Sequence, residues 1–249
     1  MQATIAMPTS VQPAPVNSQA PRQGMFIPIH KGLRRYMADA LVAVGCTDHE
    51  DAESVAATVA SVRGLVELCR VHLHAENQFI HPAMEARRPG SSRSTADEHV
   101  GHEAAFEALI ADVQAVERSA GRNRATALAV LYERLALFVA DNFEHMFEEE
   151  THNQSVLWEA YTDDELRAIE AAIVASHTPE VSAVALKWML PALSPSERVA
   201  LLSGAREGMP REAFERLLSF GASLLSERDG LKLRAAFCSG PHERKGWPA

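Results

Sequence analysis

The sequence has few cysteines and no long apolar run, and both absences exclude classes of protein. Its 249 residues include 3 cysteines, Cys46, Cys69 and Cys238. Because they are odd in number and far apart, they predict neither a disulfide framework nor a Cys-x-x-Cys metal site, and they fit a reducing cytoplasm. No stretch approaches the roughly 18 consecutive apolar residues of a membrane-spanning helix. We therefore expect a cytoplasmic protein that does not cross a membrane.

Positive charge and hairpin turns are also scarce. Lys and Arg total 24 against 33 for Asp and Glu, which gives a formal net charge of -9 at pH 7. A phosphate backbone needs a basic surface, so nucleic acid is not an expected partner. Asn-Gly and Asp-Gly pairs are nearly absent, whereas Ala, Leu, Glu and Arg recur throughout. This composition predicts an all-α fold.

Composition divides the chain into four parts. Residues 1–24 are rich in Pro, Gln, Ser and Ala and lack both a basic start and an apolar segment, which predicts a disordered leader rather than a signal peptide. Residues 25–160 are patterned as an antiparallel four-helix bundle. Residues 161–238 predict a C-terminal helical extension, and residues 239–249 predict a flexible tail.

Four long amphipathic helices are expected in the bundle because apolar residues recur every three or four positions. Their expected ranges are about 28–44, 50–87, 95 to the turn at SAGRNR, and 125–150. Pro82 removes a backbone donor and predicts a kink in the second helix. Thr47 with Glu50, and Thr95 with Glu98, have the spacing of capping boxes at helix starts.

The extension shows helix signals without the histidines and carboxylates of the bundle. Thr162 with Glu165, and Ser194 with Glu197, again have capping-box spacing. Between about residues 179 and 237 the pattern predicts three or four shorter helices, separated at PALSP, GMP and ERDG.

Most of the 11 histidines lie between residues 30 and 152. Each predicted bundle helix carries at least one on its apolar face, and two helices pair a histidine with a glutamate, in His72-x-x-x-Glu76 and His145-x-x-x-Glu149. Side chains four residues apart stack on a helix, so a neutral imidazole and a carboxylate can reach one ion. Buried carboxylates are costly unless a cation compensates them. The pattern therefore predicts a metal site inside the bundle.

The expected ligands are the imidazoles and carboxylates on these inward stripes: His30, His72, Glu76, His99, His102, Glu103, His145 and Glu149. The set is larger than one octahedral ion needs, so we expect two ions bridged by Glu76 or Glu149. On the third helix the choice among His99, His102 and Glu103 stays open. Nitrogen and oxygen ligands without a thiolate favour iron, with zinc or manganese as other occupants, over copper(I).

Two further histidines are expected beside the ligands rather than on an ion. His74 lies two residues from His72 and points away from its face, which predicts the surface or a place behind the ligands. His152 lies two turns after His145 on the same stripe, and we expect it to support the ligands from behind.

Several other polar side chains have ordinary structural interpretations. Glu98 is expected to cap the third helix, and Glu150 to belong to an acidic, solvated face. His81 precedes Pro82 and is expected to face solvent or the kink. Cys69 is expected to be a small core residue.

Four segments together make the sequence recognisable. They are IHKGLRR on the first helix, HLHAENQFIHPAMEARRPG on the second, DEHVGHEAAF on the third and FEHMFEEETH on the fourth. In this order they resemble the hemerythrin-like, HHE cation-binding domain family, over about residues 25–155. The resemblance implies a four-helix bundle with a non-haem di-iron centre that binds oxygen or responds to iron, oxygen or nitric oxide.

The resemblance also assigns ligands by position. His30 matches the family's first-helix ligand, His72 with Glu76 the second-helix pair, and His145 with Glu149 the fourth-helix pair. Oxygen-carrying members have two third-helix histidines four residues apart, whereas His99 and His102 are three apart here and Glu103 follows. Those members also use an aspartate where Glu150 stands.

Three functions are compatible with these features. The first is a di-iron protein, with an oxo or hydroxo bridge, that binds or senses oxygen or a related small molecule behind an apolar wall of Phe79, Phe106 and Phe138. The second is an oxidoreductase in which the same centre consumes peroxide or nitric oxide. The third is an interaction module with a structural metal, whose C-terminal helices bind a protein partner. We expect a binding protein more than an enzyme because no general acid, nucleophile or cofactor loop is evident.

Overall fold

The computed structural model describes residues 22–238, and every regular element in that range is a helix. The all-α prediction is confirmed. The tail predicted at residues 239–249, and all of the predicted leader except its last three residues, lie outside the described residues. Between residues 22 and 238, no helix is both long enough and apolar enough for a membrane crossing.

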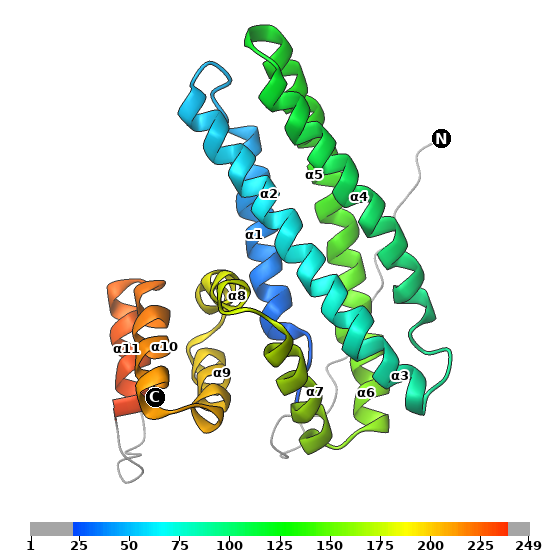
Figure 1. Cartoon of the computed structure of the whole chain (residues 1–249), viewed down its shortest axis with the longest axis vertical. Helices are drawn as coiled ribbons and strands as arrows, with labels where there is room; N and C mark the ends of the chain where they lie inside the picture. The colour runs from blue at the N-terminus through cyan, green and yellow to red at the C-terminus, as the bar shows by residue number, and fades with distance from the viewer. Residues whose placement is uncertain (1–21, 239–249) are drawn as a thin grey trace, which may run out of the picture.

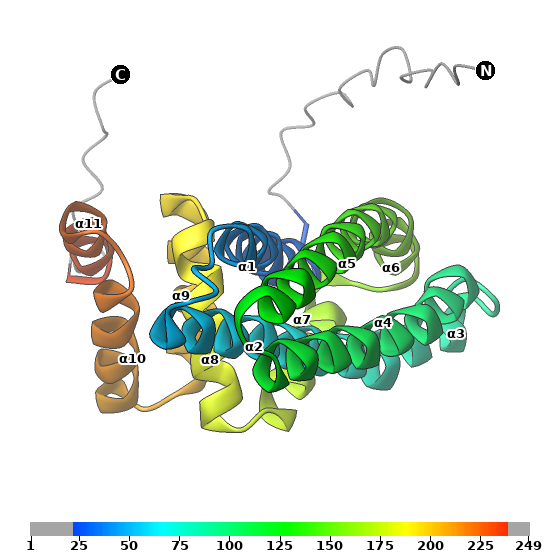
Figure 2. The same ribbon diagram turned by 90° about the horizontal axis from the view of Figure 1, so that it is seen from above.

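Four antiparallel rods form the bundle, as Figures 1 and 2 show. They are α1 (Ile27–Gly45); α2 (Ala52–Ala75) with its continuation α3 (His81–Arg87); α4 (Arg93–Arg118); and α5 (Gly121–Glu148) with its continuation α6 (Gln154–Ala160). Apolar side chains from all four rods fill the interior, among them Leu33, Leu65, Leu109 and Leu131. The predicted bundle is therefore present. The helix bounds lie within a few residues of those expected, except that the fourth rod continues about ten residues past its expected end, to Ala160.

Two rods contain a π-helical turn, and neither turn was predicted. One spans Glu76–Ile80 between α2 and α3, and the other spans Glu149–Asn153 between α5 and α6. Each turn has the backbone hydrogen bond between residues five apart that defines a π-helix. The amide of His81 donates to the Glu76 carbonyl, and the amide of Gln154 donates to the Glu149 carbonyl. The first turn stands where Pro82 predicted a kink.

The π turns shift which side chains face inward. A π turn carries one residue more than an α turn, so the stripe beyond it moves along by one position. After Glu76 the buried residue is Ile80, and Phe79 is half-buried. After Glu149 it is Asn153, and His152 is exposed. The predicted inward placement of Phe79 and of His152 is wrong for this reason.

Two of the four predicted helix caps are wrong. Asp51, not Thr47, caps α2 by accepting a hydrogen bond from the Glu53 amide. Helix α4 begins at Arg93, two residues before Thr95, and its N-cap residue makes no side-chain capping bond.

The two capping boxes in the extension are confirmed. Thr162 with Glu165 opens α7 (Asp163–Ser176), and Ser194 with Glu197 opens α9 (Pro195–Gly208). Helix α7 lies across the end of the bundle, where its fully buried Leu166 packs with Phe26, Ile80, Met84 and Leu157.

The other helices of the extension are α8 (Pro179–Ala192), α10 (Arg211–Ser223) and α11 (Glu227–Cys238). Helices α8 to α11 match the three or four short helices predicted, and they share an apolar cluster around Leu190 and Leu202. The division of the chain at residue 160 and a protein partner for these helices stay predictions.

Helix α8 joins the extension to the bundle by packing against α1 (Figure 1). The Trp188 ring stacks on the Tyr36 ring with centroids 3.7 Å apart. Gly32 permits the close approach, because a Cβ atom there would lie 3.0 Å from the Met189 side chain and backbone nitrogen. Lys31 and Glu197 form an ion pair of 2.5 Å across the same junction.

Candidate metal centre

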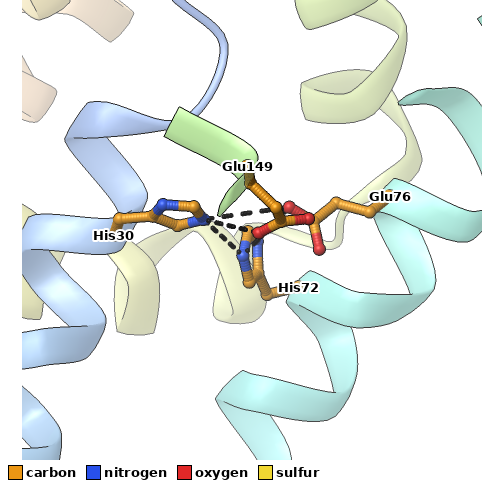
Figure 3. Close-up of side chains that lie close together, drawn as sticks. All are labelled: His30, His72, Glu76 and Glu149. Carbon is orange, nitrogen blue, oxygen red and sulfur yellow. Dashed lines mark hydrogen bonds and ion pairs between the residues drawn. The ribbon is translucent and has the colours of Figure 1, made fainter. Parts of the chain in front are cut away.

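Three rods of the bundle bring one group of four potential ligands together. His30 comes from the first turn of α1, His72 from α2, and Glu76 and Glu149 from the first positions of the two π turns (Figure 3). One ligand atom of each lies within 4.8 Å of the other three. His30 Nε2 is 3.1 Å from His72 Nε2 and 3.3 Å from Glu149 Oε2, and His72 Nε2 is 3.2 Å from Glu76 Oε1.

A second group of four shares both glutamates with the first. It adds His99 of α4 and His145 of α5, whose Nε2 atoms are 3.1 Å apart. Glu76 turns Oε1 towards His72 and Oε2 towards His99, at 3.2 Å and 3.6 Å. Glu149 Oε2 lies 3.3 Å from His30 Nε2 and 3.5 Å from His145 Nε2. Each carboxylate therefore touches both groups, as a ligand bridging two ions would.

Both glutamates are buried with carboxylate oxygens that lack hydrogen-bond partners among the described residues. Glu149 is fully buried and Glu76 is 3% exposed. Both carboxylate oxygens of Glu149, and Oε1 of Glu76, lack a hydrogen bond among the described residues. Burial raises the pKa of each carboxyl group to about 8, and the neighbouring Glu76 carboxylate adds to the shift at Glu149.

The imidazoles of the centre are mostly held neutral. Burial lowers the pKa of His99 to about 2 and that of His145 to about 3, with nearby histidines adding to both shifts, and it also lowers the pKa of His72. Burial lowers the pKa of His30 too, but Glu149 and Glu150 outweigh it and raise that pKa. Neutral imidazoles beside unpaired buried carboxylates are the donor set that cations compensate, so these residues fit a metal site.

Three of the four imidazoles are held from behind by an oxygen acceptor. His30 Nδ1 is 3.0 Å from Glu150 Oε1, His99 Nδ1 is 2.8 Å from Asn77 Oδ1, and His145 Nδ1 is 2.6 Å from Glu98 Oε2. Since these oxygens accept, each Nδ1 donates its proton and leaves the Nε2 lone pair facing the centre. Such partners fix the ring and its tautomer in metal sites.

The sequence interpretation missed all three of these partners. Glu150 was expected on a solvated face, and Glu98 was expected to cap α4. No local signal in the sequence indicated Glu150, because the residues that bind it, His30 and Arg34, come from another rod, with Arg34 Nη1 2.5 Å from Glu150 Oε1. Asn77 follows Glu76 in a π turn, and no sequence pattern indicated that geometry.

The structure does not bring every expected ligand to the centre. Glu103 points outward, with its side chain 49% exposed and 3.6 Å from Arg70. His102 is buried, but its Nε2 lies 2.9 Å from Asp141 Oδ2 and it joins neither group of four. Of the three candidates on the third helix, His99 is the one whose ring nitrogen lies beside Glu76, His145 and Glu149.

The histidines expected near the ligands also differ in place. His74 and His152 are both exposed. His81 is 5% exposed, and its ring stacks on that of His99 with centroids 4.9 Å apart. His81 is therefore buried rather than turned towards solvent, and it packs against His99, a contact that the sequence did not predict.

A small cavity borders the centre on the side of the bundle core. Its apolar walls are Leu33, Cys69, Leu73, Phe106 and Met146, and it also touches His72, Glu76, His99 and His145. Its volume of about 10 Å³ is close to the room that one water molecule needs. Phe106 packs edge-on against Phe138, as expected of an apolar wall, whereas Phe79 takes no part in this cluster.

The outer partner of His145 provides a test of the centre. We expect Glu98→Ala to weaken metal affinity about 10-fold to 100-fold, because His145 loses the acceptor that orients its ring. Glu103→Ala is the matched control, since it removes an exposed carboxylate from the same helix. Competition with a chelator of known affinity measures both variants. An equal loss in the two variants would contradict this arrangement.

The buried glutamates predict how the stability of the metal-free protein depends on pH. Their folded-state pKa values of about 8 exceed the ordinary 4.5, so the folded chain keeps protons that the unfolded chain has released. Stability then falls as pH rises towards 8, by up to about 1.4 kcal/mol per pH unit for each protonated carboxyl group. Most histidines interfere little above about pH 7, where they are neutral in the unfolded chain and their folded-state pKa values are lowered. His30, whose pKa is raised, adds a slope of the same sign that Glu76→Gln leaves in place.

Urea unfolding at pH 7 and pH 8 with a chelator present measures this slope. Glu76→Gln should flatten it, because the amide does not titrate, whereas Glu144→Gln on the exposed face of α5 should leave it unchanged. A slope that is the same in all three proteins would show that Glu76 does not keep its proton in the folded, metal-free chain.

Comparison with known protein families gives one match. A sequence model of the hemerythrin HHE cation binding domain matches residues 25–155, the span that holds three of the rods, most of the fourth, and both groups of potential ligands. A comparison with curated protein sequences gives no match.

Proposed function

Because the chain belongs to the hemerythrin HHE cation binding domain family, we propose that it holds two iron ions and binds or senses a small molecule at them. The small molecule would be oxygen or a related species, such as an oxidant or nitric oxide, and a response to iron itself is included. The proposed ligands are the six residues of the two groups: His30, His72, Glu76, His99, His145 and Glu149.

One observation carries this proposal. Two buried glutamates, each with at least one oxygen that lacks a hydrogen bond among the described residues, lie between two pairs of imidazoles, and each glutamate contacts both pairs. A single ion would use one pair and leave the other pair beside a buried carboxylate. Two ions, held by the two pairs of imidazoles and the two shared glutamates, would compensate the whole set.

Iron suits this donor set best. Imidazole and carboxylate ligands without a thiolate fit iron, and they fit zinc or manganese as less favoured occupants. Cys69 is one turn from His72, but burial raises the pKa of its thiol to about 12, so it stays a neutral core residue. An iron pair supplies redox chemistry and open coordination positions. The chain itself supplies the apolar walls that limit access of water.

The free cysteines and the size of the cavity support proposals for the cellular location and for the molecule that binds. All three cysteines are free, which fits the cytoplasmic location that we propose. The cavity admits something close to a water molecule in size, which favours a diatomic or similarly small ligand over a larger organic substrate.

Metal analysis with an absorption spectrum in air tests the proposal. We expect two irons per chain and an oxo-bridge charge-transfer band. His72→Ala should lose iron and the band, because His72 is a ligand, whereas His74→Ala should keep both, since His74 is exposed two residues away on the same helix. Zinc alone, or no metal, in the purified protein would contradict the proposal.

An oxidoreductase that consumes peroxide or nitric oxide is the second candidate. The observation that favours it is the equal sharing of ligands, since each ion would have two imidazoles and the two shared glutamates. Both ions would then keep positions for an exogenous molecule. The order His-x-x-x-Glu differs from the Glu-x-x-His of ferritin-like di-iron enzymes, which makes simple binding the first candidate.

Turnover assays separate the two candidates. If the centre is an enzyme, iron-loaded protein should remove peroxide or nitric oxide over many cycles. His72→Ala should abolish the removal while His74→Ala retains it. Wild-type protein that holds two irons and removes neither compound would exclude the oxidoreductase.

A further inference from the structure

We propose that His102 is a positioning residue for the small molecule, which it contacts through Nδ1 acting as a hydrogen-bond acceptor. The molecule would be a protic one, carrying an O–H or N–H group, bound in the cavity beside the metal ions. Among the molecules named above this means a peroxide, since oxygen and nitric oxide carry no hydrogen. This inference rests on the proposed function, because the molecule occupies the cavity next to the ion pair.

His102 is close to the centre without belonging to it. It is 4% exposed, and its ring centroid lies 4.6 Å from that of His145 and 6.2 Å from that of His99. Within residues 22–238, His102 still falls outside both groups of potential ligands. Because His102 is buried beside the centre but is in neither group of potential metal ligands, its imidazole is available for a different role.

Asp141 explains why His102 is held apart. Its carboxylate Oδ2 lies 2.9 Å from His102 Nε2, and its side chain is 68% exposed on α5. A carboxylate only accepts hydrogen bonds, so Nε2 carries the proton and donates it to Asp141. This contact draws Nε2 towards the surface and leaves the lone pair on Nδ1.

Nδ1 is the polar atom that remains for the cavity. No hydrogen bond joins it to another of the described residues. His102 is one of the residues that line the cavity. Because Nε2 is taken by the Asp141 carboxylate, Nδ1 is the ring nitrogen that we assign to the cavity side.

Apart from the proposed ligands, the other polar wall residue is Asn142. Its amide nitrogen donates to the Phe138 carbonyl at 2.9 Å, which leaves its Oδ1 as a second acceptor beside His102 Nδ1. A molecule with an O–H or N–H group would gain a bond to His102 Nδ1. An anion without hydrogen, such as azide, would meet the lone pair and gain nothing.

The first experiment compares two probes on the full chain loaded with cobalt(II) under anaerobic conditions. Hydroxylamine carries O–H and N–H groups and azide carries neither, and the cobalt absorption bands report the binding of each. We expect His102→Leu to lower the ratio of hydroxylamine affinity to azide affinity about 3-fold to 10-fold, the effect of one lost hydrogen bond.

Asp141→Asn provides a second variant at the surface, where folding is not at risk. Its amide can donate to Nε2 and so release the tautomer, and the ratio should fall again. Glu144→Gln is the matched control, because it removes the same charge from the same exposed face without touching His102, and it should keep the wild-type ratio.

A second readout observes the ring directly. Nitrogen NMR of the zinc-loaded protein should show His102 protonated at Nε2 and bound to metal at neither nitrogen. A metal-bound His102, or an unchanged affinity ratio in both His102→Leu and Asp141→Asn while two ions stay bound, would overturn the inference alone. Wild-type protein that fails to hold two ions would overturn the proposed function and the inference with it.

Discussion

Two buried carboxylates set the main constraint on this molecule. Glu76 and Glu149 lie inside the bundle with at least one oxygen each lacking a hydrogen bond among the described residues. Burying such groups costs several kcal/mol per charge unless cations or protons compensate them. The surrounding imidazoles, their acceptors at Glu150, Asn77 and Glu98, and the apolar packing around them are arranged so that ions can supply that compensation.

The π turns are the local device that places these carboxylates. Each turn begins at one of the two glutamates, directly after the α-helical turn that carries its histidine partner. The extra residue in a π turn changes the register, so the rods continue with Ile80 and Asn153 facing inward. The same rod can therefore present a histidine and a glutamate four residues apart at the centre and still bury apolar or uncharged side chains beyond it.

Helix α1 links the centre to the C-terminal helices. It carries His30 near its start and contributes Leu33 to the cavity. On its outer side it packs against α8 through Gly32 and Tyr36 and pairs Lys31 with Glu197 of α9. One helix therefore has the proposed ligand on one face and the extension on another.

The sequence by itself determined the helices, the bundle and the residues capable of binding metal, because periodic apolar residues and His-x-x-x-Glu spacing are local properties of a chain. Only the tertiary structure decided which of them meet. Glu103 and His102 lie on the same helix as His99 and were predicted as ligands on the same grounds. In the structure Glu103 lies beside Arg70 and His102 pairs with Asp141, both from other helices, and neither residue joins the centre. The π turns, and the acceptors behind His30, His99 and His145, also depend on neighbouring rods, so no spacing within one helix could reveal them.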